Sequence, residues 1–327
     1  MRKTRLVLAL PLAATAVLAG CAPHSGRAAE TMPAGSAAPA QASQPCTPLE
    51  TREPNGTGQQ PAFAGQTRTC GVRSNVAFEV AVVARGLEKP WSVEPLPDGA
   101  LLVTEKPGRM RIVSAAGQVG APIAGVLPVD ARGQGGLLDA ALSPRFATDR
   151  TVFWSFSEPR EGGNGTSVAR GVLSADRTRL EQVRVILHTQ PTYTNNMHFG
   201  SRLAFGPDGM LYVTMGERSD RVTRPQAQDL ASHLGKTLRI QPDGSAPRDN
   251  PFVGRAGALP EIWSVGHRNV QAAAFDPRGG YWIVEHGTRG GDELNHVEKG
   301  KNYGWPLTAY GIEYAGPPIT SALGAAR

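Results

Sequence analysis

The sequence predicts an all-β fold in which short sheets repeat, namely a β-propeller. Three observations lead to this class. The 327 residues include 39 glycines and 27 prolines, so turns are frequent. A pattern of strand, proline-centred turn and second strand occurs four times along the chain. The turn prolines are 47, 63 and 70 residues apart, which suits one blade plus loops of variable length.

The N-terminal segment, residues 1–20, is predicted to be a lipoprotein signal peptide. Three of the first five residues are basic, and the apolar run over residues 6–17 is too short for a stable membrane span. It ends in Leu-Ala-Gly-Cys21, which resembles the bacterial lipobox, where the cysteine is lipidated. A plain cleavage site with an incidental cysteine is the alternative. We therefore expect a cell-envelope lipoprotein that contacts the membrane through its lipid, and Ala22 favours the outer membrane facing the periplasm.

Residues 21–75 are predicted to be a lipid-anchored tether followed by a disulfide-closed segment. Up to about residue 45, Ala, Pro, Ser and Gly dominate, and this stretch has too few large apolar side chains to fold. Cys46 and Cys70 then form an even pair, which in an oxidising envelope favours a disulfide over two free thiols. The cysteine spacing supports neither a zinc site nor a redox relay.

Residues 76–327 are predicted to be one incomplete propeller domain. The four repeats cover residues 93–105, 141–154, 203–215 and 273–285, with turns at Pro97, Pro144, Pro207 and Pro277. A β-sandwich also has short strands, but it would not repeat this pattern four times. A fifth blade is expected to begin near Lys301 and the chain stops at Arg327, so we expect about four to five blades. Such an open ring would expose unpaired strand edges.

The stretch 264–305 is the first candidate for a functional site. It holds three of the seven histidines and two apolar runs, 272–275 and 281–284, which we expect to pair as strands across a turn at Pro277. Polar groups then fall at strand ends, where loops on a rigid sheet carry binding and catalytic residues. A polar rim without function is the alternative.

The charge distribution gives no sign of nucleic-acid binding. The net charge of +6 falls to +3 without the three basic residues of the signal peptide. No cluster of lysine and arginine interleaved with aromatic residues remains, so nucleic acid is not an expected partner.

Several short motifs occur in a consistent order over residues 76–315. They are Pro90-Trp91, GQGGLLD at 133–139, HFGSRL at 198–203, GPDG at 206–209, GHRN at 266–269, EHG at 285–287, GDELN at 291–295 and NYGWP at 302–306. Together they resemble the soluble aldose sugar dehydrogenases of the glucose/sorbosone dehydrogenase family, six-bladed propellers that use pyrroloquinoline quinone (PQQ) and calcium. The resemblance implies oxidation of the anomeric C1 hydroxyl of an aldose sugar to a lactone. Electrons would pass to a small redox carrier or to a membrane quinone or cytochrome.

The resemblance also assigns catalytic and cofactor-binding residues. His198 matches the general base that takes the proton of the anomeric hydroxyl, a task that suits a neutral imidazole. Gln134 matches a glutamine that contacts the cofactor and the substrate oxygen. Arg268 and Asn269 match the pair that holds the quinone, and a guanidinium can stabilise the negative charge that develops there. His286 lies beside the cofactor in the same match. Without the resemblance, His198 would be a strand-end histidine, Gln134 a turn residue and Arg268 part of a salt bridge between blades.

Two calcium sites are implied in the same way. The main-chain carbonyls of Gly287 and Thr288 match the ligands of the catalytic ion, although many relatives carry proline at the second position. That ion would act as a Lewis acid on the quinone. Glu293 and the carbonyl of Tyr303 match a second, structural calcium site. An acid that caps a turn is the alternative for Glu293.

Two other functions stay open at this point. A calcium-dependent lactonase-type hydrolase would hold its metal through side chains on the propeller axis, and the match to the quinone-holding pair argues against it. A truncated, non-catalytic fragment is favoured by the early end of the repeats. Relatives take basic partners of the PQQ carboxylates from the last two blades, and each lost charged hydrogen bond would cost about 1.5–3 kcal/mol.

Overall fold

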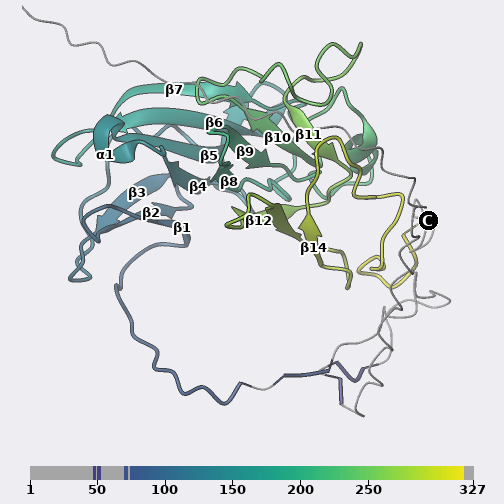
Figure 1. The fold of residues 1–327 in the computed structure, drawn as a ribbon, viewed down its shortest axis with the longest axis horizontal. Coiled ribbons are helices and arrows are strands. Elements are labelled where there is room, and N and C mark those ends of the chain that lie inside the picture. Colours follow the sequence, from purple (N-terminus) through teal and green to yellow (C-terminus); the bar gives the residue numbers. More distant parts are fainter. Residues whose placement is uncertain (1–46, 49, 53–69, 73, 320–327) are drawn as a thin grey trace, which may run out of the picture. The chain divides into compact units, whose positions relative to one another are not determined.

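The computed structural model describes residues 47–48, 50–52, 70–72 and 74–319, and these contain four antiparallel sheets (Figure 1). The first sheet consists of β1 (Pro90–Pro95), β2 (Leu101–Glu105) and β3 (Arg109–Val113). The second consists of β4 (Leu137–Leu142), β5 (Thr151–Arg160), β6 (Gly163–Leu173) and β7 (Leu180–His188). The third consists of β8 (Leu203–Phe205), β9 (Leu211–Thr214), β10 (Lys236–Ile240) and β11 (Ile262–Val265). The fourth consists of β12 (Val270–Phe275), β13 (Tyr281–Glu285) and β14 (Glu293–His296). Two short helices, α1 (Phe146–Asp149) and the 3-10 helix η1 (Arg224–Gln228), lie in connections.

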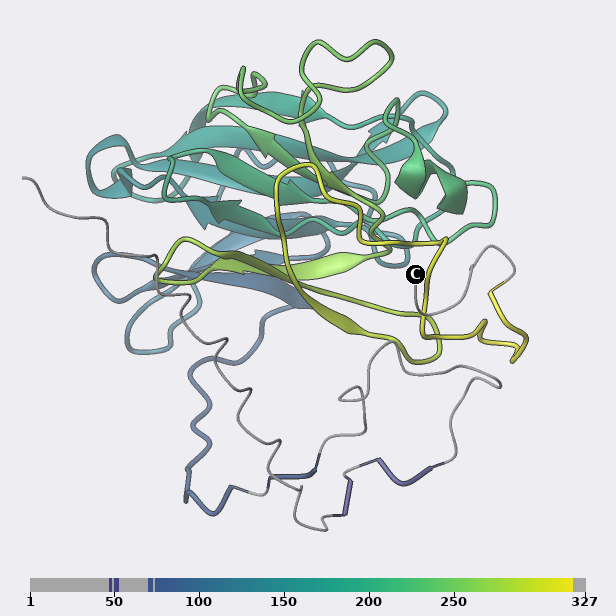
Figure 2. The same cartoon turned by 45° about the vertical axis from the view of Figure 1, so that its right-hand side comes forward.

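Within each sheet, every strand pairs with the next strand along the chain. The first strands of successive sheets contact one another: β1 contacts β4, β4 contacts β8, and β8 contacts β12. The sheets therefore follow one another in chain order with their first strands adjacent, as the blades of a propeller do (Figures 1 and 2). The predicted all-β propeller class is confirmed.

The predicted repeats form the first two strands of the four sheets. In the first repeat, Gly99 closes the turn with a φ of 82°, a left-handed conformation that glycine adopts at little cost. The predicted pairing of 272–275 with 281–284 is also confirmed, and Phe275 lies opposite Tyr281.

Apolar side chains fill a cluster between each pair of neighbouring sheets. Strand β5 shows how one strand serves two clusters, because successive side chains of a strand point to opposite faces. Trp154 packs in the cluster shared with the first sheet, and Phe153 packs in the cluster shared with the third sheet. Both side chains are buried, so the second sheet is covered on both faces.

The segment that follows β14 packs on existing elements. The carbonyl of Lys301 accepts a hydrogen bond from the N–H of Val265 (3.1 Å), and Asn302 forms a single bridge with the same residue. Residues 297–319 contain no further strand, so the part of the chain that the structure describes holds four blades and not the fifth expected near Lys301.

The predicted N-terminal features lie mostly outside the described residues, including the signal peptide, Cys21 and Cys46. Cys70 is disulfide-bonded. The described residues 74–89 contain no strand, and the first strand begins at Pro90. No helix in the described ranges has the length and apolar character needed to cross a membrane.

Candidate active site

His198 lies in the loop between β7 and β8, and only 5% of its surface is exposed. Its Nδ1 atom is 2.8 Å from Oε2 of Glu217, which follows the end of β9. Because carboxylate oxygens accept hydrogen bonds, this contact favours the tautomer of a neutral imidazole that carries its proton on Nδ1 and leaves Nε2 as an acceptor. Nε2 has no hydrogen-bond partner among the described residues, so the imidazole is arranged as a base.

The backbone of the His198 loop is held in an uncommon conformation. His198 has a φ of 46°, in the left-handed region that costs energy for residues other than glycine. Its N–H donates to Oε1 of Gln134 (2.7 Å), and the N–H of Gln134 donates to the carbonyl of Asn196 (2.8 Å). A Cβ at Gly216 would overlap the His198 carbonyl. Gln134 therefore helps to position the loop of the predicted base.

Arg268 and Asn269, between β11 and β12, lie against the same loop. The carbonyl of Arg268 accepts a hydrogen bond from the N–H of Glu217 (2.9 Å). The side-chain oxygen of Asn269 accepts one from the N–H of Gly200 (3.1 Å). The predicted base and the predicted quinone-holding pair thus belong to one site.

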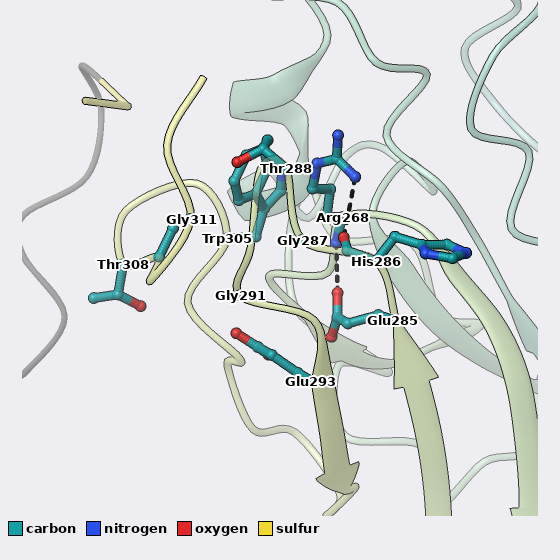
Figure 3. A pocket seen from close by; sticks show the side chains of 11 residues that line it. Arg268, Glu285, His286, Gly287, Thr288, Gly291, Glu293, Trp305, Thr308 and Gly311 are labelled. Carbon is teal, nitrogen blue, oxygen red and sulfur yellow. Dashed lines mark hydrogen bonds between the residues drawn. The ribbon is translucent and has the colours of Figure 1, made fainter. Parts of the chain in front are cut away.

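A pocket lies beside Arg268, where β13 ends and β14 begins (Figure 3). Its lining includes five of the predicted site residues together with Trp305; the five are Arg268, His286, Gly287, Thr288 and Glu293. Figure 3 draws Arg268, Thr288 and Trp305 at the upper end of this pocket and Glu293 at the lower end, and all four residues line it.

Several donors at this end of the pocket have no partner. The N–H of Arg268 donates to Oε2 of Glu285 (2.7 Å), its Nη1 donates to the carbonyl of His286 (3.1 Å), and its guanidinium lies 5.5 Å from the centre of the Trp305 ring. Nε of Arg268, Oγ1 of Thr288 and Nε1 of Trp305 are buried and make no hydrogen bond within the described ranges. Buried donors of this kind are costly unless a ligand meets them.

Two carboxyl groups meet at the other end of the pocket. The amide of Asn295 donates to Oε1 of Glu285 (3.0 Å) and to Oε2 of Glu293 (2.9 Å). Burial, reinforced by the charge of Glu285, raises the pKa of Glu293. Glu285 also pairs with Nδ1 of His267 (2.8 Å), whose ring stacks on Tyr303. Glu293 therefore lines the pocket, while the ring of Tyr303 packs on His267.

The remaining predicted residues are placed as follows. His286 is exposed, its Nε2 is 2.9 Å from Oε1 of Gln271, and its ring points away from Trp305 (Figure 3). No cluster of three or more His, Cys, Asp or Glu side chains in the described ranges is arranged to hold a metal ion. A cation in this pocket would therefore take main-chain carbonyls, such as those of Gly287 and Thr288, in addition to any carboxylate ligand.

A sequence model of the glucose/sorbosone dehydrogenase family matches residues 87–326. The chain belongs to this family.

Individual relatives also support membership of this family. The chain is 43% identical over 248 residues to the aldose sugar dehydrogenase YliI of Escherichia coli, a match that covers 75% of this chain and 66% of that protein. A crystal structure of a glucose dehydrogenase has a TM-score of 0.71 at 49% identity and covers 73% of this chain and 69% of the other. The PQQ-bound aldose sugar dehydrogenase of Streptomyces coelicolor has a TM-score of 0.60 at 35% identity and covers 70% and 66%. The chain thus spans just under two thirds of the length of the Escherichia coli relative.

Within this family member, three site residues were not identified from the sequence: Glu217, Glu285 and Arg218. The two acids carry a signal that was available. In three of the four repeats, a glutamate stands at the end of the second strand or three residues beyond it, at Glu105, Glu217 and Glu285. Because the second strand runs antiparallel to the first, its end lies beside the residues that precede the first strand, where His198 and Arg268 are found.

Proposed function

We propose that this family member oxidises the anomeric C1 hydroxyl of aldose sugars to lactones, with PQQ as the hydride acceptor. The observation that carries the proposal is the buried His198–Glu217 pair, which the hydrogen bond from the Glu217 N–H to the Arg268 carbonyl joins to a residue that lines the pocket. The names of the relatives support it, since one is an aldose sugar dehydrogenase and another was solved with PQQ.

The residues of the pocket fit PQQ, a polyanionic quinone. Three buried donors without a partner, on Arg268, Thr288 and Trp305, are suited to carboxylate and carbonyl oxygens. Arg268 is 4% exposed. The neighbouring Glu285 carboxylate accepts a hydrogen bond from the backbone N–H of Arg268 and not from its guanidinium, which keeps its positive charge for a ligand. The Trp305 ring is buried, with the guanidinium groups of Arg224 and Arg268 5.1 and 5.5 Å from its centre, so it offers its indole N–H and not an open stacking face. We therefore assign these three residues as the main contacts of the cofactor.

Each of these side chains has its own role in the proposed reaction. When bound, PQQ supplies a two-electron acceptor for the hydride that leaves C1. Nε2 of His198 takes the hydroxyl proton as the O–H bond breaks and the C=O bond forms. Glu217 keeps the proton of the imidazole on Nδ1 and stabilises the imidazolium that results. Arg268 stabilises negative charge in the pocket, and the Asn269 side chain braces the loop of the base through Gly200.

Two calcium sites are proposed, one in the pocket and one beside Glu293. The carbonyls of Gly287 and Thr288 would hold one ion, and Glu293 with the Tyr303 carbonyl a second. In support, Glu293 and Glu285 share one amide donor, and the pKa of Glu293 is raised by burial, so a nearby cation would favour its ionised form.

We also propose an envelope location for this activity. The lipobox-like sequence that ends at Cys21 would supply a lipid anchor, and a disulfide between Cys46 and Cys70 would close the segment before the propeller. Electrons would then pass to a small redox carrier or to a membrane quinone or cytochrome.

Sugar-dependent dye reduction by the purified protein, after incubation with PQQ and Ca²⁺, tests the proposal. We expect activity with aldose sugars, and His198→Gln should reduce kcat by about 10²- to 10⁴-fold because a general base contributes that much. His188→Gln is the matched control, since the His188 side chain is 55% exposed and pairs with Glu158 of β5 in the second sheet. Folded protein that binds PQQ yet reduces no dye, or equal loss in both variants, would overturn the assignment.

A further inference from the structure

Arg218, next to Glu217, is the most completely enclosed arginine near the site, with 0% of its surface exposed. Its Nε donates to the carbonyl of Met197 (2.9 Å), and its Nη2 donates to the carbonyl of Asn195 (2.6 Å). The guanidinium lies 4.1 Å from the centre of the Phe199 ring. One side chain therefore contacts three residues of the His198 loop.

Arg218 contacts every second residue of this loop. Arg218 binds residues 195, 197 and 199, and His198 lies between the second and third of them. Glu217 holds the His198 imidazole from the neighbouring position. Arg218 thus holds the backbone of the loop, and Glu217 holds the imidazole ring of His198.

Arg218 is itself anchored to a different sheet. Nη2 donates to Oδ1 of Asn164 on β6 (2.6 Å), and the amide of Asn164 donates to Oδ2 of Asp130 (2.8 Å). Burial lowers the pKa of Arg218 to about 10, so the side chain remains a cation at neutral pH. The loop is therefore tied to the rigid ladder of the second sheet.

We propose that Arg218 is a positioning residue, which holds residues 195–199 so that His198 keeps its left-handed backbone and its contact with Glu217. The fork geometry of a guanidinium matters here, because three carbonyls and one amide oxygen are bound from fixed directions. The kinetic part of this inference rests on the proposed function, whereas the spectroscopic part does not.

The experiment is ¹⁵N NMR of the histidine side chains in the protein without added cofactor. The chain has seven histidines, and the His198 signals are assigned by their loss in His198→Gln. In the unsubstituted protein we expect a single tautomer with the proton on Nδ1. In Arg218→Met we expect both tautomers or exchange-broadened signals for His198, because the loop is released.

Arg239→Met is the matched control. Arg239 is also buried, lies 5.2 Å from the Trp263 ring and binds Asp208 and Asn250, all away from the His198 loop. Its loss should lower the melting temperature comparably and leave the His198 signals unchanged. Arg218→Lys keeps the charge without the fork, and it provides a second test if Arg218→Met does not fold.

Two results decide the inference. Tautomer exchange at His198 in Arg218→Met or Arg218→Lys, but not in Arg239→Met, supports it. Unchanged His198 signals in a folded Arg218 variant overturn it, whatever the activity. Where dye reduction is present, kcat should fall about 10- to 100-fold in Arg218→Met with little change in KM, because misplacing a base by about 1 Å costs that much. A rise in KM with an unchanged kcat would contradict a positioning role.

Discussion

Lys236, the first residue of β10, is a buried amine that forms no ion pair within the described ranges of the chain. Its Nζ donates to the carbonyls of Gln226 (2.6 Å) and Leu234 (2.8 Å). Burial lowers its pKa to about 7. In the unfolded chain a lysine titrates near pH 10.4. Between these values the unfolded chain holds a proton that the folded protein lacks, so the contribution of Lys236 to stability rises with pH from about 7 to about 10.

Replacing Lys236 should therefore remove a pH dependence. We expect the free energy of unfolding of the unsubstituted protein to gain up to about 1.4 kcal/mol per pH unit from Lys236 between pH 7 and pH 9. Lys236→Met should lack this gain, and exposed Lys301→Met should retain it. Urea unfolding at three pH values measures the slopes. Equal slopes in all three proteins would show that Lys236 stays charged in the folded protein.

At the scale of residues, short motifs predicted individual site residues but not how their side chains are held. His198, Arg268 and Asn269 were predicted in this way, and in the structure Asn269 binds the loop that contains His198 and Arg268 binds Glu217. The contact of His198 with Glu217 joins residues on either side of the β8–β9 hairpin, so it depends on strand pairing that no local motif contains. Arg218 gave no sequence signal, because its partners are mainly backbone carbonyls.

At the scale of elements, the repeats predicted the first two strands of each sheet and missed most of the others. The proline-centred turn marks only the first hairpin. Strand β6 contains Gly163, Gly165 and Gly171, which weaken a strand pattern. It is nevertheless a long strand, because it pairs with β5 along nearly its whole length and with β7 from Ser167 to Leu173. Pairing on both sides thus overrides local propensity.

Strand β5 also provides a prediction about stability. Trp154 is fully buried in the cluster between the first and second sheets, so Trp154→Ala should destabilise the protein by about 3–5 kcal/mol through lost burial and a cavity. Val253→Ala, on an exposed loop, should cost under about 0.5 kcal/mol. Urea unfolding of the two variants measures both values. A small effect of Trp154→Ala would mean that the first two sheets are not coupled through this cluster.

At the scale of the whole molecule, the site arises from the repetition of the blades. Gln134 precedes β4, His198 precedes β8, and Arg268 precedes β12, so each stands just before the first strand of its sheet. Because the first strands are adjacent, equivalent positions in successive blades gather in one place. Glu217 follows the second strand of the third sheet and binds His198, and Glu285 ends the second strand of the fourth sheet and binds Arg268. The sequence alone could not show this convergence, since it depends on how the sheets pack.

Ligand binding should therefore stabilise the propeller as a unit. PQQ with Ca²⁺ at about 100 times its Kd should add about 2.7 kcal/mol to the free energy of unfolding, which raises Tm by about 5–10 °C for a domain of this size. Scanning calorimetry with and without PQQ measures the shift, and a calcium chelator should reverse most of it. Arg268→Met should abolish the shift, because the buried cation of the pocket is lost, and Arg239→Met should keep it. A shift that survives in Arg268→Met would place the bound molecule elsewhere, and it would separate the Arg268 pocket from the chemistry of His198.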